Sequence, residues 1–178
     1  MASDVKKIEL GPAIVEYGDA QDTVLFETTI GGVVLTVETT YREQKIDQKG
    51  ETVVSKRITG RNAKVTVPFA EYDLEKIPQI MVGATLVEDT TGGGKKVEIT
   101  TAVGQDLIAK AKKVVIKPVA AKNDPSKWAT LPMAYPETDL QYNFDNDNER
   151  ITNITLNSTP TEEDLILILG DEKVKSTP

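Results

Sequence analysis

The chain has 178 residues, of which 39% are hydrophobic and 28% are charged, a composition that predicts a globular protein with a buried core. Its formal net charge of −7 argues against a nucleic-acid-binding surface, which needs a basic face, but is compatible with a protein past which DNA slides. The chain has no cysteine, which excludes disulfides and thiolate metal sites.

The apolar residues are mostly Val and Ile with few aromatics, which is the composition of strands. The longest apolar run, residues 165–169, is far shorter than the roughly 20 residues of a membrane-spanning helix. The first ten residues lack the apolar core of a signal peptide. We therefore expect a single domain over residues 1–178 that folds in a cytoplasm.

The first 69 residues predict strands joined by turns. Val33, Leu35 and Val37 alternate with polar residues, which indicates a half-buried strand. Gly18 followed by Asp19 suits a turn, and so does Gly60 followed by Arg61. The strands expected here are residues 11–18, 23–28, 31–41, 52–60 and 62–69.

Residues 39–52, "TTYREQKIDQKGET", separate two of these strands by far more than a tight turn such as Asn-Gly needs. The charges of this segment balance in sign, and Ile46 is set among them. Loops of this length without regular structure are uncommon unless they are functional or disordered. Two interpretations stay open: a passive solvated loop, or an arm that contacts a partner.

The hydrophobic period changes after residue 69. Ala70, Leu74, Ile77 and Met81 recur at the spacing of an amphipathic helix, and acidic residues crowd its start, where the helix dipole favours negative charge. Pro78 should stop or kink this helix. We expect one short helix over about residues 70–79.

The second half of the chain predicts further strands. Residues 83–103 suggest a hairpin that turns at glycines 92–94, and the two prolines of residues 128–136 predict an edge strand. The segment after residue 104 fits a helix or a strand, and its β-rich end favours a strand over about residues 112–117. The other expected segments are strands at 140–144, 150–159 and 164–171 and a flexible tail at 171–178. About ten strands and one helix predict a mainly β sandwich or barrel.

The sequence gives little support for catalysis. There is no histidine, the commonest general base and metal ligand. The run "TGGGKK" lacks two residues that a phosphate-binding loop requires, so it is interpreted as a hairpin turn. Asp145, Asp147 and Glu149 begin like a calcium loop, but an EF-hand would need glycine at Arg150 and glutamate at Leu156. We expect that the protein is not an enzyme and binds no cofactor and no metal. A hydrolase that uses carboxylates is kept as the weakest of three functional interpretations; the other two are given below.

Several segments occur in a characteristic order. They are "IELGPAIVEYG" (8–18), the stretch 23–77 ending in "VPFAEYDLEKI", "KVVIKP" (112–117), "LPMAYP" (131–136), "LQYNFDNDNER" and "ITNITLNST". In this order they resemble the major tail tube protein family of tailed bacteriophages, over most of the chain. The resemblance implies a β-sandwich or barrel-like tail tube fold with one short flanking helix and a long inter-strand loop.

The resemblance also implies a function. It predicts a structural virion protein, made in the host cytoplasm, whose hexameric rings stack into the tube through which DNA is ejected. Its partners would be other copies of itself and the tail tip or baseplate, tape measure and tail terminator proteins. The implied contact loop consists of Tyr41, Arg42, Glu43, Gln44, Lys45, Ile46, Asp47, Gln48, Lys49 and Gly50. We expect this loop to be mobile in an isolated subunit and ordered in a tube.

An acidic lumen would repel the phosphates of passing DNA. The candidate lumen residues, chosen as polar positions that alternate with the core face, are Glu38, Glu98 and Asp139. The alternative interpretation is an extracellular β-sandwich binding module for a sugar or protein ligand. Such modules usually present exposed aromatic platforms, whereas the one Trp and five Tyr here are scattered along the sequence.

Overall fold

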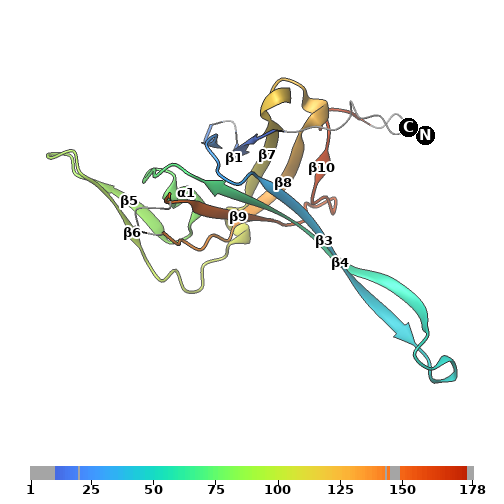
Figure 1. Ribbon diagram of the computed structural model, residues 1–178. Helices are drawn as coiled ribbons and strands as arrows, with labels where there is room; N and C mark the ends of the chain where they lie inside the picture. Colours follow the sequence, from blue (N-terminus) through green and yellow to red (C-terminus); the bar gives the residue numbers. More distant parts are fainter. Residues whose placement is uncertain (1–10, 20, 143, 145–148, 176–178) are drawn as a thin grey trace.

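The computed structural model describes residues 11–19, 21–142, 144 and 149–175, and these residues form a mainly β protein (Figure 1). They contain ten strands and a single short α-helix, so the predicted fold class is confirmed. Eight strands make one antiparallel sheet, and the other two make a separate hairpin. The order across the large sheet is β2 (Val24–Phe26), β1 (Ala13–Tyr17), β7 (Lys112–Pro118), β8 (Ala129–Pro136), β9 (Thr152–Ser158), β4 (Val53–Phe69) and β3 (Val34–Lys45), with β10 (Ile168–Leu169) paired to β8.

The small hairpin consists of β5 (Ala84–Glu88) and β6 (Lys95–Ile99), and it turns where the glycines predicted. It projects from one end of the molecule, near α1 (Ile77–Ile80) (Figure 1). Short 3₁₀ turns occur at Asp47–Lys49, Ile108–Lys110, Val119–Ala121 and Pro125–Lys127. No helix in the described ranges is long and apolar enough to cross a membrane.

The core lies on one face of the large sheet. Along the second half of β4, alternate side chains are buried, among them Val65, Val67 and Phe69. Phe69 packs edge-to-face on Phe26 with ring centroids 5.2 Å apart. Because each such side chain contributes about 1.5–3 kcal/mol on full burial, this alternating row fixes the register of β4. The other buried apolar residues that belong to this cluster are Val15, Tyr17, Ala63, Ile80, Val114, Ile116, Leu131, Ala134, Ile154 and Leu156.

The sheet curls around this core. An isolated bridge joins Thr29, which follows β2, to Phe69 at the end of β4. The Ala70 N–H donates to the Thr28 carbonyl at 3.1 Å, and the Ile30 N–H donates to the Pro68 carbonyl at 3.1 Å. The segment after one edge strand therefore reaches β4 on the other side, but the described strands do not close into a barrel.

The predicted helix over residues 70–79 is wrong in extent, since only Ile77–Ile80 is α-helical. Pro78 lies at the start of this helix rather than at its end. Proline has no N–H to donate inside a helix, but its fixed φ suits the first helical turn, where no N–H bond is needed. The carboxylate of Asp73 accepts the Glu75 N–H at 2.9 Å, which holds the preceding acidic residues in a turn.

The prediction that residues 128–136 form an edge strand is also wrong, since β8 is paired on both sides. Pro132 lies where the pairing of β8 with β7 shifts register, between Leu131 and Ala134. On its other side, β10 pairs with Ala129 and Thr130, whereas β9 pairs only from Ala134 onward. A residue without an N–H is therefore accommodated inside the sheet because no ladder bond is due at its position.

Several other predicted boundaries need correction. The predicted turn at Gly60 and Arg61 is absent, because β4 runs unbroken from Val53 to Phe69, all of it in the described part. The predicted strand at 140–144 is not seen at residues 140–142 and 144, and the one at 164–171 shrinks to Ile168–Leu169. The flexible tail at 171–178 stays a prediction; within this segment, Lys113 Nζ lies 2.6 Å from a Glu172 carboxylate oxygen.

Candidate functional site

The most prominent feature of the molecule is a two-stranded ribbon that projects from the body (Figure 1). We call residues 39–60, from the last part of β3 through the tip to Gly60 of β4, the arm. Strand pairing extends further into the arm than the sequence indicated: Tyr41 pairs with Ile58, and pairing continues to Lys45 opposite Val53. Only residues 46–52 lie outside the paired strands.

The tip of the arm is held by its own backbone. The Lys49 N–H donates to the Ile46 carbonyl at 2.9 Å, and the Gly50 N–H donates to the Asp47 carbonyl at 3.2 Å. Gly50 has φ 58° and ψ −132°, a conformation that favours glycine. The tip therefore has local backbone partners, and the expected change from a mobile arm in the isolated subunit to an ordered arm in a tube stays a prediction.

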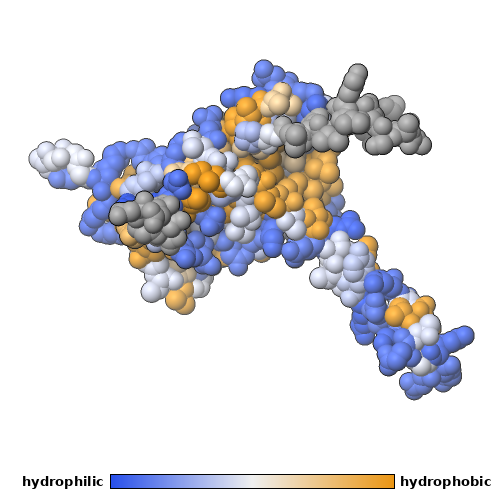
Figure 2. Space-filling view, viewed as in Figure 1, coloured by the Kyte–Doolittle hydropathy of each residue, from blue (hydrophilic) through white to orange (hydrophobic). Residues whose placement is uncertain are grey.

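One face of the arm carries apolar side chains. Val37 lies opposite buried Ala63, and Tyr41 is four residues further along β3, so these side chains share a face. Tyr41 and its partner Ile58 are 55% and 57% exposed, and Val37 is 44% exposed. We call Val37, Tyr41, Ile58 and Val53 the apolar stripe. It continues the core face of the sheet beyond the body, and apolar side chains are visible on the arm in Figure 2.

Ion pairs flank the apolar stripe. Lys56 Nζ lies 2.9 Å from Glu43 Oε1 and 5.0 Å from the centroid of the Tyr41 ring. The hydrogen bond from Lys56 lowers the pKa of Glu43, and the same bond raises the pKa of Lys56. Lys45 pairs with Glu51. Two charged residues of the implied contact loop, Glu43 and Lys45, are thus already paired within the arm.

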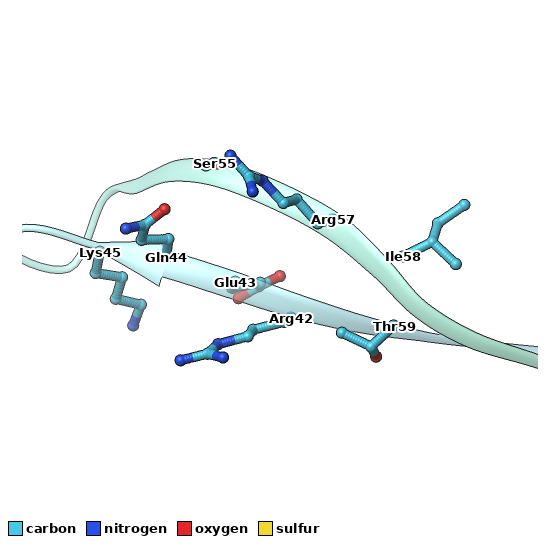
Figure 3. A pocket seen from close by; sticks show the side chains of 8 residues that line it. All are labelled: Arg42, Glu43, Gln44, Lys45, Ser55, Arg57, Ile58 and Thr59. Carbon is cyan, nitrogen blue, oxygen red and sulfur yellow. The ribbon is translucent and has the colours of Figure 1, made fainter.

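The register of the arm also places two arginines at opposite positions of the paired strands. Arg42 of β3 lies directly opposite Arg57 of β4. Like charges in directly opposite positions destabilise a strand pair. Neither guanidinium has an ion-pair or hydrogen-bond partner among the described residues. The arginines border a shallow hollow whose lining residues are Arg42, Glu43, Gln44, Lys45, Ser55, Arg57, Ile58 and Thr59 (Figure 3).

The three candidate lumen residues lie on three separate elements. Glu38 is on β3 near the base of the arm, where its carboxylate is 3.1 Å from Lys64 Nζ. Glu98 is on β6 of the small hairpin and pairs with Lys96. Asp139 is exposed in the segment between β8 and β9.

The structure gathers aromatic residues that looked scattered in the sequence. The rings of Tyr72 and Tyr142 are 5.8 Å apart, and those of Tyr142 and Phe144 are 6.5 Å apart. The Arg150 guanidinium lies 4.4 Å from the Phe144 centroid and 5.9 Å from that of Tyr72. The spacing of Tyr142 and Phe144 at alternate positions was the only sequence signal for this cluster. Of the candidate calcium ligands nearby, Asp145 and Asp147 lie outside the described residues.

The structure also shows an acidic groove that sequence reasoning missed, because its two walls are far apart in the chain. One wall is formed by β2 and the residues beside it, and the other by the segment between β4 and α1. The lining residues are Thr23, Val24, Leu25, Glu27, Glu71, Asp73, Glu75, Lys76 and Gln79.

Comparison with known proteins gives little to add to this geometry. No family model matches the chain, and no curated protein matches it. Solved structures that match include a chain of the six-fold symmetrised cryo-EM structure of the anti-feeding prophage (AFP) baseplate, at 11% identity. That match covers 88% of this chain and 91% of the baseplate chain, with a TM-score of 0.37. A TM-score of this size shows neither a shared fold nor a shared function.

Proposed function

We propose that this protein is a structural subunit that assembles with copies of itself through the arm. The observation that carries the proposal is the apolar stripe, which continues the core face onto a ribbon that nothing in the described chain covers. Full burial of a side chain such as Ile58 contributes about 1.5–3 kcal/mol, so a partner surface that covers the stripe gains a substantial free energy. An exposed apolar patch on an extended element is typical of an interaction site.

The edge of the sheet supports the same proposal. β3 is an edge strand of 12 residues, so one side of its backbone is available for pairing. Proteins that remain monomeric usually keep such edges short or cover them. The charged residues of the arm keep it soluble while still allowing a matched partner to bind.

The finer form of the proposal follows the resemblance of the sequence to tail tube proteins. In that form the subunits build hexameric rings that stack into a phage tail tube, and DNA passes through the lumen without specific binding. The subunit would require no cofactor and catalyse no reaction. The net charge of −7 supports this form, because an acidic tube would not retain the phosphates of DNA.

The test is to remove the arm without touching the core. Thr39 lies directly opposite Arg61, so residues 40–60 can be replaced by Asn-Gly, which closes a two-residue hairpin. None of the buried core side chains found in the described chain comes from residues 40–60. The truncated protein should therefore stay folded by circular dichroism but form no rings or stacks by negative-stain microscopy at concentrations where the full chain does. Assembly equal to that of the full chain would refute the proposal.

The aromatic cluster favours a second candidate, a binding module for a sugar or protein ligand. Phe144 is 75% exposed, as a stacking platform would be. Arg150 already covers a face of Phe144 and of Tyr72, which leaves less ring surface for a ligand. A glycan array probed with the monomer tests this candidate. Binding that Phe144→Ala abolishes would favour it, and the absence of binding would count against it.

A further inference from the structure

Arg42 and Arg57 of the arm have no neutralising carboxylate within the described residues, so an anionic partner surface would suit them. Arg42 lies opposite Arg57 in the register of the ribbon, with the two side chains extending away from each other (Figure 3), and Gln44 lies opposite Ser55 two residues closer to the tip. Planar guanidinium groups suit carboxylates because each can form two parallel hydrogen bonds. A surface that supplies carboxylates to both arginines would neutralise the two guanidinium groups and add charge-assisted hydrogen bonds.

The acidic groove offers such a surface. Its lining contains the carboxylates of Glu27, Glu71, Asp73 and Glu75 and the ammonium group of Lys76. Lys76 Nζ is 3.3 Å from Glu71 and 3.8 Å from Asp73, and Lys95 pairs with Glu75 from the small hairpin. Four carboxylates therefore face two lysines, and Glu27 has no ion-pair partner within the described residues.

One carboxylate of the groove, that of Glu71, is held by hydrogen bonds. Thr28 Oγ1 donates a hydrogen bond to Glu71, and this bond, with a further contribution from Lys76, lowers the pKa of Glu71. The groove also has an apolar part, Leu25 and Val24 of β2. The arginines of the arm and the carboxylates of the groove are thus complementary in charge.

The two surfaces lie at opposite ends of a single strand. Arg57 is near the start of β4, and Glu71 is two residues beyond its end at Phe69. In Figure 1 the tip of the arm and α1, which follows the acidic segment, lie at opposite ends of the molecule. At about 3.3 Å per residue, the 14 steps from Arg57 to Glu71 span roughly 46 Å, so one copy cannot fill its own groove.

We propose that Arg42 and Arg57 of one copy dock in the acidic groove of a second copy, with Glu27 as a principal acceptor. The contact is head-to-tail: each copy that gives its arm still offers an empty groove. Contacts of this kind propagate into open stacks unless a rotation closes them. This inference rests on the proposed self-assembly and specifies the surface that receives the arm.

Charge reversal tests the contact. The arm variant is Arg42→Glu/Arg57→Glu, the groove variant is Glu27→Lys/Glu75→Lys, and the combined variant carries all four changes. The control, Lys122→Glu/Lys173→Glu, makes the same change in net charge as the arm variant at exposed lysines elsewhere. Circular dichroism and thermal unfolding of every variant would establish that the subunits are folded, and sedimentation would give the critical concentration for stacking.

We expect the arm variant and the groove variant each to raise the critical concentration by tenfold or more, on the order of what reversing several interface charges costs. The combined variant should recover to within about threefold of the parent, because both signs are reversed together. The control should match the parent.

Two results would overturn the inference alone: single variants that stack as readily as a stacking parent, or a combined variant that fails to recover. The second would mean that the arginines meet a different anionic surface. A parent chain that stays monomeric at every concentration would instead refute the proposed function, and the docking contact with it.

Discussion

Tyr41 on β3 lies directly opposite Ile58 on β4, and both side chains are more than half exposed at a point where the ribbon has left the body of the protein. Cross-strand pairs of an aromatic and a β-branched residue stabilise a sheet, and this pair stabilises the arm. More than half of each side chain remains exposed to solvent, and this exposed apolar surface adds nothing to the stability of a monomer. Under the proposed function, this pair would be the centre of the interface with another subunit.

Replacing this pair should separate assembly from folding. We expect Tyr41→Ser/Ile58→Ser to weaken assembly by about 2–4 kcal/mol for each contact, from the lost burial of two large side chains. The unfolding temperature of the monomer should change little. The matched control is Val103→Ser at a position that is 89% exposed in a loop. Sedimentation velocity measures the effect, and equal assembly of both variants would show that the stripe is not buried in the interface.

Salt should weaken stacking if arginine–carboxylate pairs hold the subunits together. Raising the sodium chloride concentration from about 0.05 M to 0.5 M shortens the screening length severalfold, so the critical concentration should rise. Tyr41→Ser/Ile58→Ser should retain this dependence, whereas Arg42→Glu/Arg57→Glu should lose or invert it. A critical concentration that falls with salt in the parent would indicate an interface dominated by apolar contacts.

The core should depend strongly on Phe69. Its ring packs against Phe26, and Lys76 Nζ lies over it at 4.6 Å from the centroid. We expect Phe69→Ala to lower the free energy of unfolding by about 3–5 kcal/mol, as is usual for a buried Phe. Phe144→Ala, at an exposed site, should change it by less than about 0.5 kcal/mol. Urea denaturation of both variants gives the comparison, and similar losses would contradict the assigned core.

Stability should fall at high pH because of Tyr17. Burial raises the pKa of its hydroxyl to about 12, and Asp22 adds to the shift. The pKa of an unfolded tyrosine is near 10, so the folded state holds its proton more tightly. The stabilisation is complete below about pH 10 and is lost as the pH rises from 10 to 12, by up to about 2–3 kcal/mol.

The variant Tyr17→Phe isolates this effect from the titration of the other tyrosines and the lysines. It also removes a hydrogen bond of 3.3 Å from the Tyr17 hydroxyl to the Lys110 carbonyl, so it should be somewhat less stable at neutral pH. Its unfolding free energy should decline less between pH 10 and 12 than that of the parent. Parallel curves for the two proteins would show that Tyr17 ionises equally well in both states.

Period-two alternation was enough to predict most of the strands, because a strand that is buried on one face has apolar residues at every second position. Val65, Val67 and Phe69 follow this pattern, and the glycines between β5 and β6 indicate the turn of that hairpin. The continuity of β4 could not be read in this way. Gly60 lies beside a register shift between Thr40 and Tyr41, and a glycine at a bulge looks locally like a glycine at a turn.

The position of the candidate site in the sequence could be predicted, but its structure as a paired two-stranded ribbon could not. The length and charge of the segment after Thr39 singled it out, yet its polar residues concealed that it is a paired ribbon, since both of its faces meet solvent. The pairing of Arg42 with Arg57 depends on the register shift between Thr40 and Tyr41, which no local pattern reveals. The acidic groove joins Glu27 to Glu71 across the fold, where the bridge from Thr29 to Phe69 and the hydrogen bond from Thr28 to Glu71 bring those segments together.

The unbroken course of β4 has a mechanical consequence. The same strand forms half of the arm and, through Val65, Val67 and Phe69, part of the core. A pull on the arm along its length would act on β4 parallel to its pairing with β9, where residues Lys64 to Phe69 face Asn157 to Thr152. Ladder bonds perpendicular to the pull share the load instead of opening one at a time. A chain of subunits linked through their arms would therefore resist stretching through its sheets rather than through its loops.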